Sequence, residues 1–300
     1  MFPAPGHCLS TFRVKVGLLG RGRGHSEGVK GAMGGSDARF GVRTVLALMS
    51  LTLVAIPFGL VLFLVQDKWS PLLSADNGLR DGLHRFTTEH PWFAGVMRFL
   101  STVGSAPVYF VVFAVVTGWL LYRRLPRLAA FAVVAEVGGA VLNQVVKTLV
   151  HRARPIVVDP VAHFSGMSFP SGHAQSAVVS YSFLLLVFLP AMSISWRRIA
   201  AGVAVVMVLG IGVSRVALSA HYASDVLAGY ILGAAWVIAM TATFSAWRRE
   251  RGRNGVRPSE GLAPEDAARL TPAALPEPRP AADRESAADA TRPGSGDSRQ

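Results

Sequence analysis

Long apolar stretches separated by short polar segments dominate the middle of this chain. A helix of roughly 20 apolar residues crosses the hydrocarbon core of a bilayer, and a membrane-spanning segment must satisfy its own backbone hydrogen bonds. The pattern therefore predicts an all-α protein built as a six-transmembrane helix bundle. The expected spans are Thr44–Val65, Phe99–Tyr122, Leu128–Val146, Ala174–Trp196, Ile199–Val213 and Val226–Trp247.

The two ends of the chain have a different composition. Residues 1–42 are rich in glycine and basic residues and lack the short apolar stretch and cleavage site of a signal peptide. Residues 248–300 are dominated by Pro, Ala, Arg, Glu, Asp and Ser, without a lasting apolar period. We therefore expect a disordered basic tail at 1–42, a six-span domain at 43–247 and a second disordered tail at 248–300.

The arginines and lysines predict how the chain is oriented. The 300 residues are 51% hydrophobic with a net charge of +12, and basic residues gather in both tails and in the turns at 123–127 and 197–198. Such clusters mark the cytoplasmic side of a plasma-membrane protein. Both termini are expected there, so the charge reports topology and no motif supports nucleic-acid binding. The single cysteine, Cys8, excludes an intramolecular disulfide.

The opposite, extracytoplasmic face is expected to carry three polar motifs. The first has Lys147 and Arg154 with six residues between them, followed by Pro155, where the third span ends. Lysine supplies a point charge and arginine a planar fork that can hold two phosphate oxygens. Both side chains could instead be interfacial anchors that extend from a span end toward water.

The second motif, Pro170-Ser171-Gly172-His173, directly precedes the fourth span. Serine is a good helix cap, glycine permits close backbone approach, and the free N–H groups at a helix start attract anions. An ordinary capped helix entry would look similar. The imidazole of His173 favours chemistry, because it can hold or deliver a proton near neutral pH.

The third motif contains Ser214-Arg215, His221 and Asp225. If the sixth helix begins near Ala220, the spacing of four places His221 and Asp225 on one helix face, and the carboxylate can orient the imidazole for attack. The pair could also be metal ligands. However, zinc needs a third ligand, and the nearby Lys147, Arg154 and Arg215 would repel a cation.

Together these motifs resemble the three-part signature of the type 2 phosphatidic acid phosphatase family, without departure at any signature position. The resemblance covers about Thr44–Trp247. It implies a metal-independent phosphatase in which His221 forms a phosphohistidine, Asp225 orients His221, and His173 protonates the leaving oxygen. The phosphoryl oxygens would be held by Lys147, Arg154, Ser171, Gly172 and Arg215.

The family also implies the partners of the enzyme. The substrate would be a lipid phosphate or diphosphate of the undecaprenyl diphosphate, phosphatidylglycerophosphate or phosphatidic acid type, with no cofactor and no obligatory protein partner. Two alternatives use the same scaffold: a phosphotransferase with the same intermediate, and a non-catalytic lipid-binding or transport protein. Retention of His173, His221 and Asp225 counts against the second.

Other polar residues receive different interpretations. Glu136, in the third span, is expected to hydrogen-bond a neighbouring helix, because an isolated carboxylate is costly there. Asn143 and Gln144 are expected to support helix packing. His151 and Arg152 could touch the second phosphate of a diphosphate. The segment Leu79–Leu100, with aromatic residues among polar ones, could lie in the membrane interface beside a lipid chain or pack on the bundle.

Overall fold

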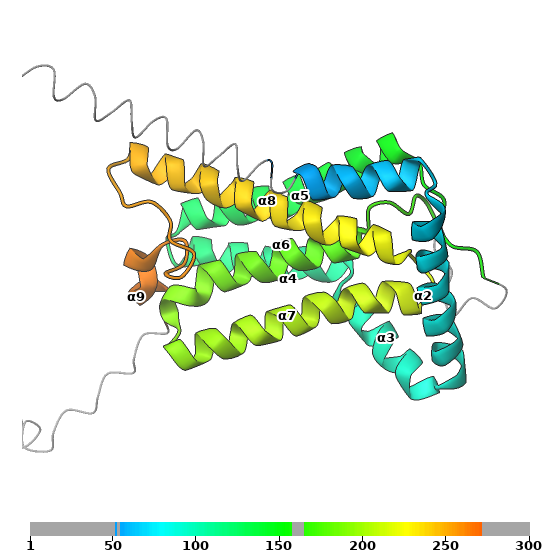
Figure 1. The fold of residues 1–300 in the computed structure, drawn as a ribbon. Helices are drawn as coiled ribbons and strands as arrows, with labels where there is room; N and C mark the ends of the chain where they lie inside the picture. The colour runs from blue at the N-terminus through cyan, green and yellow to red at the C-terminus, as the bar shows by residue number, and fades with distance from the viewer. Residues whose placement is uncertain (1–51, 53–54, 158–164, 272–300) are drawn as a thin grey trace, which may run out of the picture. The chain divides into compact units, whose positions relative to one another are not determined.

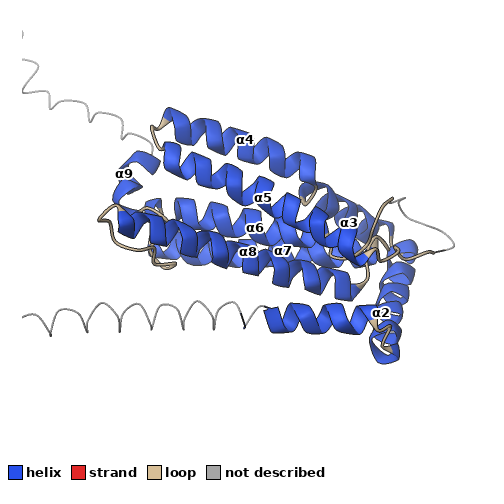
Figure 2. Ribbon diagram, turned by 90° about the horizontal axis from the view of Figure 1, so that it is seen from above, coloured by secondary structure: helices blue, strands red, loops and turns tan. Residues whose placement is uncertain are grey.

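The structure is a computed structural model that describes residue 52, residues 55–157 and residues 165–271. Within these residues the regular structure is helical, apart from an isolated bridge between Arg257 and Gly261 (Figures 1 and 2). The all-α prediction is confirmed for this part of the chain. Residues 44–51 and 53–54 of the first expected span, the expected tail at 1–42 and residues 272–300 lie outside the described residues.

Most of the helices follow one another with short connections, whereas residues 151–171 separate α5 from α6. They are α2 (Ser70–Glu89), α3 (Pro91–Val103), α4 (Ala106–Tyr122), α5 (Pro126–Val150), α6 (Gly172–Phe188), η1 (Leu189–Ala191), α7 (Ile194–Ala217), α8 (Ala223–Glu250), η2 (Pro264–Asp266) and α9 (Ala267–Leu270). A shorter apolar helix, Ala55–Gln66, precedes α2.

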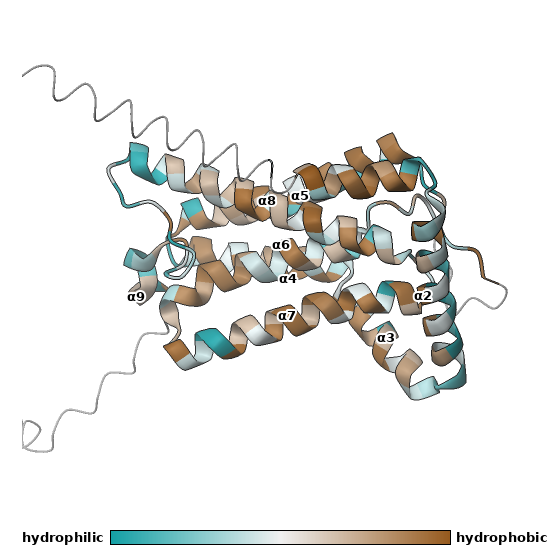
Figure 3. Ribbon diagram, viewed as in Figure 1, coloured by the Kyte–Doolittle hydropathy of each residue, from teal (hydrophilic) through white to brown (hydrophobic). Residues whose placement is uncertain are grey.

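Several of these helices are long and apolar enough to cross a membrane. Among the described residues there are four: α5, α6 with η1, α7 and α8. The pair α3 and α4 passes the same criterion as one span bent by 47°, which brings the number to five. Figure 3 shows apolar residues along these helices and polar ones concentrated toward their ends. The six-span count therefore remains a prediction.

The second expected span, Phe99–Tyr122, is broken rather than continuous. The helix stops at Val103 and restarts at Ala106, with Ser105 in an extended conformation and Pro107 in the new first turn, where its missing N–H costs nothing. Gly104 sits at the break because Ile211 of α7 fills the space: a Cβ on Gly104 would lie 2.5 Å from its side chain. Close packing thus fixes the bend.

The boundary between the fourth and fifth spans also differs from the prediction. The fourth helix ends at Phe188 with a 3₁₀ turn through Pro190, well before Trp196. The helix α7 begins at Ile194, so it is longer than the expected Ile199–Val213. The predicted span began after Arg197 because membrane spans are expected to lack charged residues. In the structure Arg197 lies in the first turn of α7, where its Nε donates to the carbonyl of Met192 at 3.0 Å.

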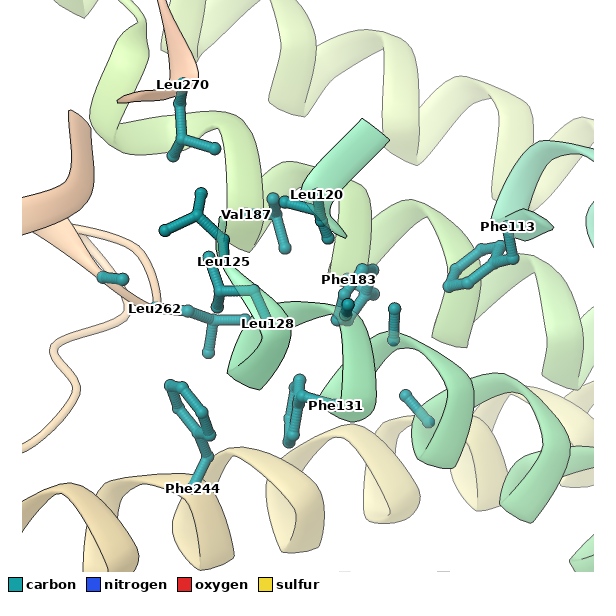
Figure 4. Packing of buried hydrophobic residues seen from close by; sticks show 14 of the residues in the cluster. Phe113, Leu120, Leu125, Leu128, Phe131, Phe183, Val187, Phe244, Leu262 and Leu270 are labelled. Carbon is teal, nitrogen blue, oxygen red and sulfur yellow. The ribbon is translucent and has the colours of Figure 1, made fainter. Parts of the chain in front are cut away.

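Residues 248–271 differ from the expectation of a disordered tail. The helix α8 continues through Arg248, whose buried guanidinium donates to the carbonyls of Asn254 at 2.9 Å and Leu262 at 2.6 Å. Leu262 and Leu270 join a buried cluster with residues of α4, α5, α6 and α8 (Figure 4). The sequence of this segment shows no regular apolar period because only Arg248, Leu262 and Leu270 hold it against the helices, rather than a continuous apolar face.

Candidate active site

The three sequence motifs meet at one end of the long helices, the end that α2 crosses in Figure 1. Lys147 lies in the last turn of α5 and Arg215 in the last turn of α7, whereas His173 and Asp225 lie in the first turns of α6 and α8. Ser214 lies one residue before Arg215 in α7, and Gly172 is the first residue of α6. The remaining members come from the connecting loops or the cap of α6. Lys147, Arg154, Arg215 and His221 are all close enough to His173 to act electrostatically on its imidazole.

His221 precedes α8 instead of lying on it. The helix starts at Ala223, after the N-cap Tyr222, so the conditional start near Ala220 was wrong. The residue pair still meets: His221 Nδ1 lies 3.6 Å from Asp225 Oδ2. Asp225 also accepts the backbone N–H of Tyr222 at 2.9 Å, in a capping box. The carboxylate thereby fixes the helix start and the imidazole together.

The second ring nitrogen of His221 faces a cation. His221 Nε2 lies 3.3 Å from Arg154 Nη1, which also donates to the carbonyl of Ala220 at 2.8 Å. Arg154 Nε donates to the carbonyl of Ser165 at 3.0 Å, so the guanidinium is held from two sides. The imidazole thus lies between the carboxylate of Asp225 at Nδ1 and the guanidinium of Arg154 at Nε2, a group of the kind that binds phosphate.

Burial determines the protonation of His221. Its exposed fraction is 2%, and this desolvation lowers its pKa to about 4, although the hydrogen bond and charge of Asp225 act in the opposite direction. The positive charges of Arg215 and Arg154 lower the pKa further. Burial lowers the pKa of Arg154 as well. At neutral pH His221 is therefore an uncharged imidazole with one nitrogen lone pair available.

Ser171 and Gly172 form the start of α6. Ser171 is the N-cap, but its side chain makes no capping bond, and its buried Oγ has no hydrogen-bond partner among the described residues. A Cβ on Gly172 would lie 3.2 Å from Asn143 Oδ1 and 4.0 Å from Lys147 Nζ. Glycine at this position therefore brings the backbone of the α6 start close to the lysine.

Two glycines of α8 seat this helix start. A Cβ on Gly229 would lie 2.6 Å from the carbonyl oxygen of Ser171, and one on Gly233 would lie 2.9 Å from the carbonyl oxygen of Gln175. Small residues at this spacing let two helices of a membrane bundle approach closely. The Ser171 N–H in turn donates to the backbone carbonyl of Asp225 at 2.9 Å, which ties the second motif to the third.

Arg215 is buried, and its guanidinium donates to Ser101 Oγ of α3. Its backbone carbonyl accepts the N–H groups of Ala220 at 2.9 Å and His221 at 3.1 Å. Ser219, with a φ of 55°, closes this turn. The residue thus provides a positive charge at the end of α7 and also fixes the loop that presents His221.

Sequence reasoning missed the function of Arg152 in the structure. The sequence left open that this residue could touch the second phosphate of a diphosphate. In the structure its guanidinium has other partners: Nη1 donates to Asp225 Oδ1 at 2.6 Å and to Ser224 Oγ at 2.7 Å, and Nη2 to Asp76 Oδ2 at 2.9 Å. It also lies over the ring of Tyr222, 4.4 Å from the centroid. The neighbouring His151 is exposed.

Asp76 and Ser168 were not recognised either. Asp76, buried in α2, accepts the N–H of Ser224 at 2.9 Å, and Ser168 Oγ donates to Asp225 Oδ2 while lying 3.4 Å from His221 Nδ1. The only sequence signal for Asp76 was an acid in an otherwise amphipathic segment. Its partners lie more than 70 positions away, and no local pattern reveals them.

Glu136 and Asn143 support helix packing, as expected, but the same expectation for Gln144 was wrong, because its side chain is exposed. Ser180 Oγ donates to Glu136 Oε2 at 2.9 Å, which joins α5 to α6. Asn143 Nδ2 donates to Gln175 Oε1 at 2.6 Å, whereas Gln144 is exposed. Among the described residues, no group of three or more His, Cys, Asp or Glu side chains is arranged to hold a metal ion.

Comparison with known proteins identifies the family. The family model of the PAP2 superfamily matches residues 127–249, which contain all three motifs. The chain is 32% identical to phosphatidylglycerophosphatase B of Bacillus subtilis (strain 168) over 151 residues, which is 48% of this chain and 71% of that protein. The chain belongs to the PAP2 superfamily.

Further PAP2 relatives agree with this assignment. An undecaprenyl-diphosphatase of Sulfolobus acidocaldarius is 28% identical over 187 residues, 59% of this chain and 85% of that protein. The crystal structure of a transmembrane PAP2 type phosphatidylglycerolphosphate phosphatase from Bacillus subtilis matches with a TM-score of 0.57 and 25% identity. It covers 63% of this chain and 93% of that one. The resemblance inferred from the motifs is thus confirmed, and the apolar helices place the protein in a membrane.

Proposed function

We propose that this PAP2 phosphatase hydrolyses a lipid phosphate or diphosphate through a phosphohistidine on His221, at a site on the extracytoplasmic side. The observation that carries the proposal is the setting of one imidazole: its Nδ1 faces Asp225 and its Nε2 faces Arg154. A nucleophile held by an acid on one side, with a cation on the other to receive phosphoryl oxygens, is suited to in-line attack.

The reaction would proceed in two steps. His221 Nε2 attacks phosphorus, the bond from phosphorus to the lipid-side oxygen breaks, and His173 gives that oxygen a proton. Water then attacks the phosphohistidine, His173 accepts its proton, and inorganic phosphate leaves with His221 restored. Lys147, Arg154 and Arg215 would stabilise the charge on the three equatorial oxygens, with the Ser171 hydroxyl and the Gly172 backbone N–H beside them.

The helices at the site end support a lipid substrate. Leu83, Phe93 and Met97 pack with residues of the α7 end, so this segment belongs to the bundle. Other apolar side chains of the same segment face outward: Leu79, Trp92 and Phe99 are 55%, 66% and 64% exposed. Apolar residues left uncovered beside an active site suit the membrane interface, where lipid chains enter. The segment Leu79–Leu100 therefore packs on the bundle with one set of side chains and offers another set to the membrane interface.

The decisive experiment is to trap the intermediate. Incubation with substrate labelled in the phosphoryl group, followed by an alkaline quench, should yield an acid-labile phosphoprotein in the parent enzyme and none in His221→Ala. His173→Ala should retain the intermediate but form it more slowly, mainly with phosphate monoesters, since a departing diphosphate needs less protonation. A phosphoprotein that persists in His221→Ala would overturn the assignment.

A panel of lipids in detergent would then establish the substrate class. Phosphate release is measured from undecaprenyl diphosphate, phosphatidylglycerophosphate and phosphatidic acid at equal surface concentrations, with and without an added alcohol acceptor. The proposal expects free phosphate as the main product. Transfer of the phosphoryl group to the acceptor would instead identify a phosphotransferase, and a lack of turnover with retained binding would indicate a lipid-binding protein.

A further inference from the structure

A second basic pocket lies at the opposite end of the same helices. It has a volume of about 250 Å³ and is bordered by the start of α5, the end of α8 and the segment that folds back after α8. Because α5 and α8 each have their other end at the catalytic residues, the length of a span separates this pocket from the active site. It has no role in the chemistry of His221.

The charge of this pocket is strongly unbalanced. One carboxylate lines it, that of Asp266, against five arginines: Arg124, Arg127, Arg248, Arg253 and Arg269. Arg248 and Arg253 share the carboxylate of Glu265, at 2.9 and 3.2 Å. Within the described residues neither Arg124 nor Arg127 forms an ion pair. Two guanidinium groups thus border the pocket without an acidic partner there.

The floor of the pocket is apolar. Leu125, Leu128 and Phe244 line it and belong to the buried cluster of Figure 4. Trp247 forms one wall, with the guanidinium of Arg127 5.1 Å from its ring centroid. A pocket with arginines on its rim and carbon at its base can hold a charged group and the apolar chain attached to it. An anion that lacks such a chain would leave the base uncovered.

We propose that this pocket binds the phosphodiester headgroup of an anionic phospholipid of the surrounding bilayer. Three observations support it. The span-end position places the pocket at the depth of lipid headgroups, and Arg124 and Arg127, which form no ion pair with the described residues, can bind phosphate oxygens. The apolar base receives the first part of the acyl chains. A phosphodiester is not a monoester substrate, so the bound lipid is a resident ligand. It joins α5, α8 and the segment 251–271 into one unit.

The test uses the full-length protein in detergent, titrated with dioleoyl phosphatidylglycerol or dioleoyl phosphatidylcholine and followed by native mass spectrometry. Saturating vanadate is present, so that the active site is occupied. We expect one phosphatidylglycerol to bind saturably and far more tightly than phosphatidylcholine. In Arg124→Gln/Arg127→Gln the affinity should fall by about tenfold or more, because each arginine near a lipid phosphate contributes about a factor of five.

The matched control is Arg198→Gln/Arg249→Gln, which removes the same charge at the same end of the bundle outside this pocket; its affinity should match the parent. Equal binding by the parent and the pocket variant would overturn the proposal. Binding that is seen in a parallel titration without vanadate but is lost at saturating vanadate would also overturn it, since the lipid would then occupy the active site. Competition by soluble glycerophosphoglycerol at the affinity of the lipid would show a site for the free headgroup and would overturn the role of the acyl chains.

Discussion

Arg152 Nη1 lies 2.6 Å from Asp225 Oδ1, on the carboxylate whose other oxygen faces the imidazole of His221. The same guanidinium reaches Asp76 in α2 at 2.9 Å. One side chain therefore connects a helix that crosses the bundle end to the acid that orients the nucleophile. Because Arg152 is occupied by these partners, its effect on the reaction passes through Asp225.

Replacing Arg152 with glutamine should lower kcat by about 10- to 100-fold and leave KM nearly unchanged, because a small displacement of a reacting group is costly while the phosphate-binding cations remain. Arg152→Lys should recover part of the lost kcat. Asp76→Asn should lower kcat in the same way as Arg152→Gln. Steady-state kinetics on purified protein provide the measurement. Exposed Arg98 offers a control in Arg98→Gln. A rise in KM alone would instead indicate direct contact with substrate.

Gly229 is predicted to control the placement of Ser171 and thus of the α6 start. Gly229→Ala would place a methyl group 2.6 Å from a backbone oxygen, which cannot move aside as a flexible side chain can. We expect a loss of about 1 to 3 kcal/mol in stability and reduced activity at temperatures where the protein remains folded. Gly118→Ala is the matched control, since nothing lies within 4 Å of its Cβ position. Equal thermal midpoints for both variants would contradict the packing argument.

The residue spacing was sufficient to predict the three motifs and their convergence, because each motif lies next to an apolar stretch long enough to fix which end of a span it occupies. The break at Gly104 and the start of α7 at Ile194 could not be predicted in this way. The first depends on Ile211 from a distant helix, and the second on arginines that a helix tolerates at its first turn. The position of Arg152 between Asp225 and Asp76 could not be predicted either, because Asp76 is far away in sequence.

His221 should make stability depend on pH. Its pKa is about 4 in the folded protein against 6.5 for a free imidazole, so the unfolded chain binds more protons between these values. Stability should therefore fall as the pH decreases from 6.5 toward 4, whereas above 6.5 this contribution does not change. Thermal midpoints in detergent, measured from pH 7.5 to 4.5, should decline less in His221→Asn than in the parent. Parallel curves would show that His221 does not cause the decline.

Phosphate release should survive strong chelation and be inhibited by vanadate. Vanadate can adopt the five-coordinate geometry of the transferring phosphoryl group, which Lys147, Arg154 and Arg215 are placed to stabilise. The assay compares activity before and after dialysis against EDTA, followed by addition of single divalent metals. If EDTA abolished activity and one metal restored it, the metal-independent mechanism would be wrong. Lys147, Arg154 and Arg215 would then have a role other than replacing a metal ion.

The last prediction concerns the side of the membrane on which the site lies. Ile156 follows the first motif and is 90% exposed, whereas Arg198 is exposed in the first turn of α7, at the other end of the bundle. In a Cys8→Ser background, Ile156→Cys should react with a membrane-impermeant maleimide on intact cells, and Arg198→Cys only after lysis. The arginine clusters at 123–127 and 197–198 require this result if they are cytoplasmic. The reverse labelling pattern would place His221 inside the cell and would restrict the substrate to lipids of the inner leaflet.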